Sequence, residues 1–254
     1  MMGLRRDGLI SQHRGVVMAP KHMVAAAHPL AAAEGLRILD MGGNAVDAAL
    51  AMAGVTTVVL PDQCGLGGDA VLLIYEARRH RMWAINGIGP APLGLSLQML
   101  RAQGYERMPV DGVHSIAVPG AVAGYQAAYR LMASRPWTHL WARAVSYALD
   151  GVPVGELTAR HLRDQYDKVT RGPWLSRQFL SEGQPLEAGR KLILPELGKS
   201  LAEVAESEGE SFYRGHLADR ILKSVKRLGG FFYGDEWTSM TVRPETTLHV
   251  TYRQ

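Results

Sequence analysis

The sequence of 254 residues lacks several features that would define a class of protein. It has one cysteine, Cys64, which excludes an internal disulfide framework and a paired-cysteine metal or redox site. Its nine histidines show none of the HxxxH or HExxH spacings that hold zinc. No run approaches the roughly 18 apolar residues of a membrane helix, and the N-terminus lacks the apolar region of a signal peptide. We therefore expect no metal site, no membrane span and a cytoplasmic location.

Charge of one sign is not concentrated in the sequence. The 28 basic and 24 acidic residues are interspersed and give a formal net charge of +4. This distribution provides no basic surface of the kind that binds nucleic acid. One short basic run, Arg78–Arg81, is interpreted as a solvated hairpin tip. With 47% hydrophobic and 20% charged residues, the sequence is typical of a globular protein, and no low-complexity linker divides it.

The first strong pattern is a helix over residues 29–41. Its Pro at the start and its two glycines at the end are typical helix signals. Ala32, Leu36 and Leu39 fall on one side of this helix, opposite several charged residues. The spacing predicts that this side packs inward.

A second helix and a hairpin follow. Asn44 is a candidate N-cap with Asp47 three residues later, and the Ala-rich body of residues 44–60 has no polar stripe, which predicts a helix buried on all sides. Residues 70–76, AVLLIYE, form a continuous apolar run typical of a strand covered on both faces, and residues 82–85 continue as its partner.

Shorter patterns complete the chain. Residues 114–132 predict a short strand, a Pro-Gly corner and a helix, and residues 137–169 predict two helices around a Gly-Val-Pro break. Further helices are expected within residues 195–230, and residues 246–254 alternate like a strand. The pattern predicts a mixed α/β (α+β) protein in one domain.

The Gly-rich segment at residues 64–69, CGLGGD, invites comparison with a phosphate-binding loop. It follows a helix and precedes a strand, which is the reverse of the nucleotide-binding order, and no Gly-Lys-Ser/Thr is present. We therefore do not expect nucleotide binding. Cys64 could act as a nucleophile with a histidine base, but a lone cysteine is more often a small buried hydrophobe, which is the interpretation we favour.

The other ionisable residues show no recognisable pairing. His114 is the one histidine beside an apparent functional corner, although a histidine satisfied by the backbone is the more common situation. Glu34, Asp62, Asp69 and Asp111 are most simply caps, turn residues and surface charges. Reasoning from the residues alone therefore gives a fold class and no catalytic group.

Four stretches, taken in order, resemble the large subunit of the gamma-glutamyltransferase (gamma-glutamyltranspeptidase) family. They are MVAAAHPLAAAEGLRILDMGGNAVDAALA from Met23, GLGGDAVLLIYEA from Gly65, VPGAVAGYQAAYR from Val118 and FYRGHLADRI from Phe212. The resemblance makes residues 23–254 the large-subunit part and leaves residues 1–22 as an N-terminal extension.

The resemblance implies a four-layered αββα sandwich of the N-terminal-nucleophile hydrolase type, present here only in part. Members of the family are proenzymes that cut themselves and expose a threonine at the start of the small subunit. That threonine serves as nucleophile and as its own base, so the chemistry needs no cofactor. The implied ligand is a small-molecule amide. The implied partner is the small subunit or the remainder of the proenzyme, in a heterodimer or higher oligomer.

The resemblance carries no catalytic residue onto this chain. The family's threonine lies in the small subunit, and Thr246, Thr247 and Thr251 lack the family's cleavage motif. An end partway through the large subunit is expected to leave a strand edge and a helix face uncovered, and the isolated chain is expected to be inactive.

The segment INGIGPAP, residues 85–92, aligns with the loop where gamma-glutamyl enzymes place an arginine that grips the substrate α-carboxylate. Ile88 stands at that position, and Pro90 replaces the arginine of an amidohydrolase side branch. We expect a pocket wall in which two glycines let the backbone approach a ligand and in which the contacts are apolar. The candidate substrate-binding residues are Asn86, Gly87, Ile88, Gly89, Pro90 and His114.

Three functions remain open at this point. The first is an amide hydrolase whose acyl group is not glutamyl. The second is a glutathione hydrolase or gamma-glutamyltransferase proper with a relocated carboxylate-binding residue. The third is a truncated, non-catalytic remnant that binds a ligand or partner.

Overall fold

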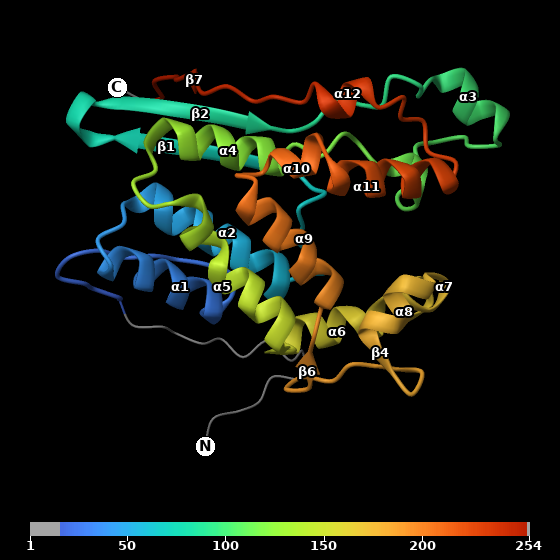
Figure 1. Ribbon diagram of the computed structural model, residues 1–254, viewed down its shortest axis with the longest axis horizontal. Helices are drawn as coiled ribbons and strands as arrows, with labels where there is room; N and C mark the ends of the chain where they lie inside the picture. Colours follow the sequence, from blue (N-terminus) through green and yellow to red (C-terminus); the bar gives the residue numbers. More distant parts are fainter. Residues whose placement is uncertain (1–15, 253–254) are drawn as a thin grey trace.

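A long β hairpin lies over a group of packed helices (Figure 1). The computed structural model describes residues 16–252. The hairpin consists of β1 (Ala70–Glu76) and β2 (Arg81–Gly87), joined at the basic tip by a 3-10 turn, and β7 (Glu245–Thr246) pairs with the other edge of β2. All three strands run antiparallel to their neighbours. The predicted mixture of helix and sheet and the predicted hairpin tip are confirmed.

The helical part is built around α2 (Ala45–Val59). It packs between α1 (Pro29–Asp40) and α5 (Trp137–Asp150), and α5 packs in turn on α9 (Pro195–Glu206). The small side chains of α2 allow this close packing, and most of the helix is buried, as predicted. The largest fully buried side chains of the described residues gather here and beside the sheet, and they include Trp137, Trp141, Trp237, Tyr213, Leu50, Ile85, Leu140 and Leu201.

The N-terminus of α2 is fixed by Asp47. Asn44 and Asp47 form the predicted capping box, and the Asp47 carboxylate also accepts hydrogen bonds from Ser134 N at 2.9 Å, Ser134 Oγ at 2.6 Å and Arg135 N at 3.1 Å. Burial opposes ionisation of this fully buried group, but the hydrogen bonds outweigh it and hold the pKa of Asp47 below its ordinary value. This one carboxylate therefore ties α2 to the turn after α4.

The inward face predicted for α1 is wrong. Leu36 is exposed, and Ala32 and Leu39 are half-buried, whereas Ala31 and Ile38 are buried in the core. The buried side of α1 is shifted by about one residue from the predicted side. It includes Gly35, where a Cβ atom would lie 2.6 Å from the sulfur of Met52 in α2, so the glycine allows the two helices to approach closely.

Glu34 lies on the buried side of α1, which contradicts the expectation of a surface charge. Its carboxylate accepts two hydrogen bonds from Arg37, at 2.5 and 2.7 Å, and Arg143 of α5 lies 3.6 Å from it. A buried carboxylate is tolerated here because it is paired twice. The contact between Glu34 and Arg143 could not be predicted, because Arg143 lies on another helix far along the sequence.

The sheet is covered on one face only. α4 (Ala121–Met132) packs under β1 and β2, and Leu72 and Ile74 point toward it and the core. Along β1 exposure alternates strictly, and Val71, Leu73 and Tyr75 on the other face are 64%, 67% and 56% exposed. The prediction of a strand covered on both faces is therefore wrong for the described chain, because nothing within residues 16–252 packs on the outer face.

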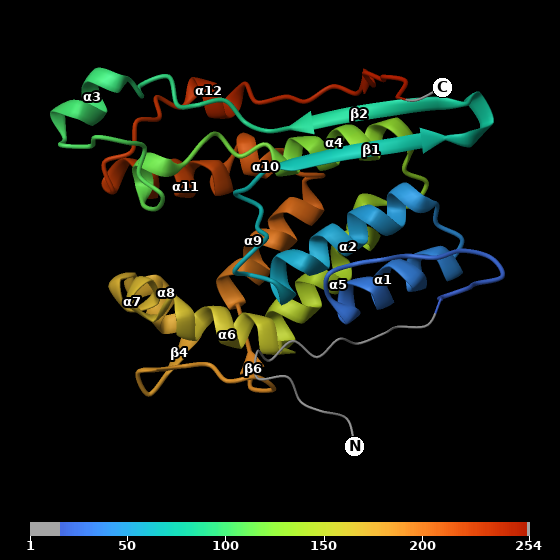
Figure 2. The ribbon, with the colours of Figure 1, turned by 180° about the vertical axis from the view of Figure 1, so that it is seen from behind.

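Short elements fill the remaining chain and gather at two places. In both views α3, α11 and α12 lie beyond the end of β2, and α6 to α8 lie at the far end of the helical part (Figures 1 and 2). Their bounds are α3 (Leu97–Ala102), η2 (Val113–Ser115), β3 (Val152–Pro153), α6 (Glu156–Asp164), α7 (Tyr166–Arg171), α8 (Pro173–Phe179), β4 (Leu180–Ser181), β5 (Gln184–Pro185), β6 (Lys191–Leu192), α10 (Glu210–Tyr213), α11 (His216–Arg227) and α12 (Asp235–Thr238).

The helices predicted after residue 120 are present, although the second helix predicted within residues 137–169 is divided at Gln165 into α6 and α7. Two predicted strands are not confirmed. The stretch before α4 forms the 3-10 turn η2 and then runs extended without joining a sheet. Only Glu245 and Thr246 pair with β2 near the predicted final strand. No helix of the described residues is long and apolar enough to cross a membrane. Of the expected N-terminal extension, residues 1–15 lie outside the described chain.

Candidate functional site

The loop after β2 forms one wall of a groove of about 480 Å³. Side chains continue the strand alternation through this loop, so Asn86, Ile88 and Pro90 face outward while the two glycines between them face the protein. The opposite wall comes from α12 and the residues that follow it. The described residues that line the groove are Asn86, Ile88, Pro90, Leu93, Asp235, Glu236, Ser239, Met240, Thr241 and Val242. The groove therefore begins where the open face of the sheet ends.

Backbone contacts hold this loop in place. The side-chain oxygen of Asn86 accepts a hydrogen bond from Ile88 N at 3.1 Å, and the carbonyl of Pro90 accepts one from Val118 N at 2.9 Å. A Cβ atom at residue 89 would lie 1.4 Å from the carbonyl oxygen of Val118, so only glycine fits there. A Cβ atom at residue 87 would lie 2.7 Å from the carbonyl oxygens of Ala70 and Gly120, which is also too close for a side chain. The structure thus gives both glycines a role in packing the loop against the protein.

Glu236 joins the two walls of the groove. Its carboxylate is buried and accepts hydrogen bonds from three backbone amides, Leu93 N at 3.2 Å, Tyr233 N at 3.1 Å and Gly234 N at 3.0 Å. The loop after β2 is therefore tied to α12 by a single side chain. Sequence reasoning missed this residue, and the one available signal was an acidic pair directly after a glycine at the start of a short helix.

The groove has no cationic side chain among its described lining residues. Its ionisable groups are Asp235 and Glu236, and Ile88 presents an apolar side chain that is 56% exposed. Ser239 and Thr241 add hydroxyl groups. Such a lining offers hydrogen bonds and apolar contact to a ligand, and it disfavours a free carboxylate at this position.

His114 lies outside this groove. Its ring stacks on Phe231 at 4.6 Å between centroids, and its nitrogens contact Tyr105 Oη at 3.3 Å and the Gly229 carbonyl oxygen at 3.1 Å. The structure therefore brings Asn86, Ile88 and Pro90 together and places His114 in a separate cluster beside α11. The contact of its ring nitrogen with a backbone carbonyl is the common situation for a histidine.

The Gly-rich segment before β1 connects neighbouring loops. The carbonyl of Gly68 accepts hydrogen bonds from Gly120 N and Ala121 N at 3.1 and 2.9 Å, and Asp69 Oδ1 lies 3.4 Å from Gly89 N. The segment thus presents a carbonyl to the first amides of α4, which is the position an anion would need.

Cys64 is exposed, so the prediction of a small buried hydrophobe is wrong. No histidine forms a hydrogen bond with its thiol among residues 16–252, as a cysteine nucleophile would need. Burial, with a smaller contribution from nearby Cys64, raises the pKa of Tyr125 to about 12. The thiol therefore lies near the partly buried phenol of Tyr125 and has no hydrogen-bonded histidine base among the described residues.

Asp62 lies exposed in a turn, as predicted, but its carboxylate is paired, which the sequence did not indicate. Its carboxylate contacts His161 Nδ1 at 2.5 Å and Thr158 Oγ1 at 2.9 Å, both on α6. Burial opposes ionisation of Asp62, but these hydrogen bonds outweigh it and lower its pKa. A nucleophilic triad needs the histidine between carboxylate and hydroxyl, whereas here the carboxylate lies between the other two. These hydrogen bonds therefore hold α6 against the segment that follows α2.

No group of three or more His, Cys, Asp or Glu side chains within the described part of the chain is arranged to hold a metal ion.

Solved structures with a similar fold include an acylase and a transpeptidase. The chain superposes on a cephalosporin acylase from Bacillus halodurans with a TM-score of 0.88 and 34% identity, covering 100% of this chain and 48% of that one. It superposes on the gamma-glutamyltranspeptidase of Helicobacter pylori with a TM-score of 0.87 and 25% identity, covering 94% of this chain and 69% of that one.

The sequence comparisons agree. The family model of gamma-glutamyltranspeptidase matches residues 31–254, and the chain belongs to this family and covers its large-subunit portion. It is 32% identical to glutathione hydrolase proenzyme 1 of Schizosaccharomyces pombe over 93% of this chain and 37% of that protein. It is 33% identical to the oxamate amidohydrolase proenzyme of Klebsiella pneumoniae over 82% of this chain and 40% of that protein. The chain therefore spans less than half the length of these relatives.

Proposed function

We propose that the chain is the large-subunit part of an amide hydrolase whose substrate carries an acyl group other than glutamyl. In this proposal residues 23–254 form the large-subunit portion, and a small subunit supplies a threonine that serves as nucleophile and base. The large subunit supplies one wall of the binding groove and no catalytic residue. The assembled enzyme works in the cytoplasm and needs no cofactor.

The lining of the groove carries this proposal. The position at which a carboxylate-gripping cation is expected holds Ile88, and the two ionisable groups nearby, Asp235 and Glu236, have the wrong sign. Losing a charge-assisted contact to a buried carboxylate typically costs about 2 to 5 kcal/mol. That corresponds to a loss of about 30-fold to several thousand-fold in affinity for a glutamyl substrate.

The open face of the sheet supports the proposed partner. Val71, Leu73 and Tyr75 of β1 and Met82 of β2 form an apolar face that leads directly to Asn86 and Ile88 of the groove. A second sheet from the small subunit, packed on this face, would complete the four-layered αββα sandwich and bury these side chains. The same sheet would bring a threonine near the groove.

The test is a substrate panel on the assembled enzyme. The chain is produced together with the coding sequence that follows it in its genome, and self-cleavage is checked by mass spectrometry. We expect turnover of anilides with short neutral acyl groups to exceed that of a gamma-glutamyl anilide by at least about 30-fold in kcat/KM. Efficient hydrolysis of glutathione or gamma-glutamyl anilide by the unmodified enzyme would contradict the proposal.

A glutathione hydrolase is the second candidate, and the similarity to the Schizosaccharomyces pombe protein favours it. It requires a cation from outside the described lining to replace the missing arginine. The same panel separates the two functions, because this candidate predicts the opposite order of substrates. A non-catalytic remnant, the third possibility, predicts neither self-cleavage nor turnover of any amide.

A further inference from the structure

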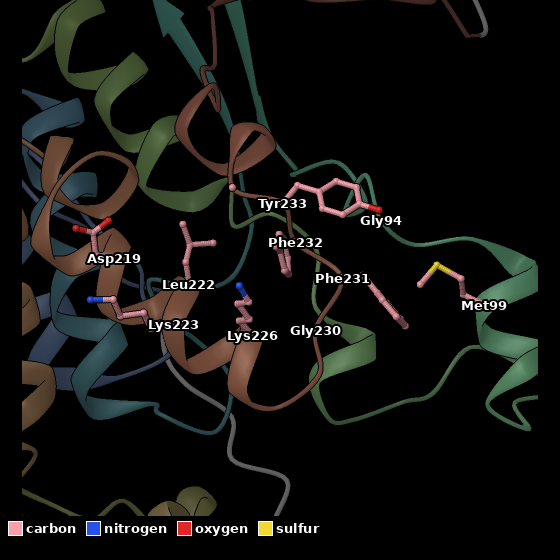
Figure 3. Close-up of a pocket in the computed structure, with 11 residues that line it drawn as sticks. Gly94, Met99, Asp219, Leu222, Lys223, Lys226, Gly230, Phe231, Phe232 and Tyr233 are labelled. Carbon is pink, nitrogen blue, oxygen red and sulfur yellow. The ribbon is translucent and has the colours of Figure 1, made fainter.

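A second pocket, separate from the candidate groove, lies between α11 and the chain segment that precedes α12. Its volume is about 570 Å³, which is within the range of small-molecule sites. Figure 3 shows α11 on one side, the extended segment through Phe231 and Tyr233 opposite it, and Met99 of α3 at the far end. The pocket is lined by Gly94, Met99, Asp219, Leu222, Lys223, Lys226, Gly230, Phe231, Phe232, Tyr233 and Gly234.

The α11 wall carries an excess of positive charge. Asp219, Leu222, Lys223 and Lys226 are spaced at helical intervals, so all four lie on one side of the helix, and all four line the pocket. Neither Lys223 nor Lys226 forms an ion pair in the described chain, where the paired lysines are Lys168 and Lys199. The wall therefore holds two free ammonium groups and one carboxylate.

The opposite wall is apolar and held in a fixed position. Phe231 stacks on His114, and its carbonyl accepts a hydrogen bond from Gly94 N at 3.1 Å. Tyr233 is 73% exposed, and Met99 is partly exposed from α3. The half-buried ring of Phe231 and the exposed ring of Tyr233 both line the pocket, and aromatic rings are suited to contact with a planar ligand.

We propose that this pocket binds a small organic anion with a planar apolar body, such as an aromatic carboxylate. The carboxylate would be held between Lys223 and Lys226, and the ring would lie against Phe231, Tyr233 and Met99. Charge complementarity favours an anion, since a neutral ligand of the same shape would leave both ammonium groups without a partner. This site goes beyond the proposed amide hydrolysis, which takes place in the groove beside Ile88.

The experiment compares two probes of nearly equal size, 1-naphthoate and the neutral 1-naphthamide, binding to the complete 254-residue chain. Affinities are measured by calorimetry, and the methyl resonance of Met99 reports the location by NMR. We expect 1-naphthoate to bind more tightly than 1-naphthamide by about tenfold or more and to shift the Met99 signal. The double variant Lys223→Gln, Lys226→Gln should remove this preference and leave binding of 1-naphthamide unchanged.

Two control variants make the result specific. Lys191→Gln, which removes an exposed lysine on β6, should leave both affinities unchanged. Leu73→Ser, on the open face of the sheet, should also have no effect, which separates the pocket from that larger apolar surface. Equal affinity for the two probes, an unchanged preference in the double lysine variant, or loss of binding in Leu73→Ser would each overturn the proposal. None of these outcomes depends on amide hydrolysis.

Discussion

Glu236 accepts a hydrogen bond from the backbone amide of Leu93 at 3.2 Å and thereby connects two parts of the chain that are 143 positions apart. The same carboxylate is hydrogen-bonded to the amides of Tyr233 and Gly234. Leu93 belongs to the wall of the candidate groove, and Tyr233 belongs to the second pocket. One buried side chain therefore fixes the boundary between the two cavities.

The first prediction concerns this carboxylate. Glu236→Ala leaves three backbone amides without their acceptor and should lower the free energy of unfolding by about 3 kcal/mol. Glu236→Gln keeps one acceptor oxygen but directs an amide donor at a backbone donor, so an intermediate loss is expected. Urea denaturation measures both. The neighbouring, exposed Asp235→Ala should change stability by no more than about 0.5 kcal/mol, and an equal loss in both alanine variants would contradict this role.

The second prediction concerns the loop position that holds Ile88. In the assembled enzyme, Ile88→Arg should raise kcat/KM for a gamma-glutamyl anilide by about tenfold or more relative to a neutral anilide, because it introduces a cation for the substrate carboxylate. Ile88→Met is the matched control, since it lengthens the side chain without adding charge. If arginine and methionine shift the substrate preference equally, the groove does not contact the acyl group.

The third prediction concerns Asp47 and pH. Its pKa is lower in the folded chain than in the unfolded chain, so its contribution to stability is present above the unfolded value near 3.9 and is lost as the pH falls through the folded value. Asp47→Asn should therefore cost about 2 kcal/mol at pH 7, and the difference from the parent should shrink below about pH 4. The exposed Asp167→Asn serves as the control in urea titrations at both pH values. A difference that does not change with pH would show that the carboxylate charge is not the stabilising feature.

The fourth prediction concerns Cys64, whose thiol is exposed and has no hydrogen-bonded histidine in the described structure. Cys64→Ser and Cys64→Ala should leave amide hydrolysis by the assembled enzyme within about threefold of the parent, because the thiolate plays no part in the proposed chemistry. Circular dichroism checks the fold of each variant. A loss of several orders of magnitude in a folded variant would make the cysteine the nucleophile.

Features set by neighbouring residues were predictable from the sequence. The cap at Asn44, the buried Ala-rich helix after it and the basic hairpin tip each depend on a few consecutive residues, and the structure confirms them. The inward side of α1 was not predictable in the same way. It is decided by which residues of α1 can approach α2 most closely and by Arg143, which pairs with Glu34 from another helix.

The sequence indicated the residues of one wall of the candidate groove and not those of the other. The loop with Asn86, Ile88 and Pro90 was found through its motif, and it forms one wall of a real groove. The other wall, with Glu236, comes from a short helix near the end of the chain that has no distinctive pattern. Likewise, Asp62 could not be paired with His161 from the sequence, because the two lie 99 positions apart and meet only when α6 packs beside the link after α2.

The most direct test of the account is a comparison of amide hydrolysis by the purified 254-residue chain alone and by the same chain assembled with a threonine-bearing small subunit. Attack on an amide needs an activated nucleophile together with oxyanion donors, and the proposed account draws the nucleophile from the small subunit. The account predicts no turnover of any amide in the panel by the chain alone. Turnover should appear on assembly and disappear when the first threonine of the small subunit is replaced by alanine. Turnover by the isolated chain that survives repurification would contradict the account and place the active site within this chain.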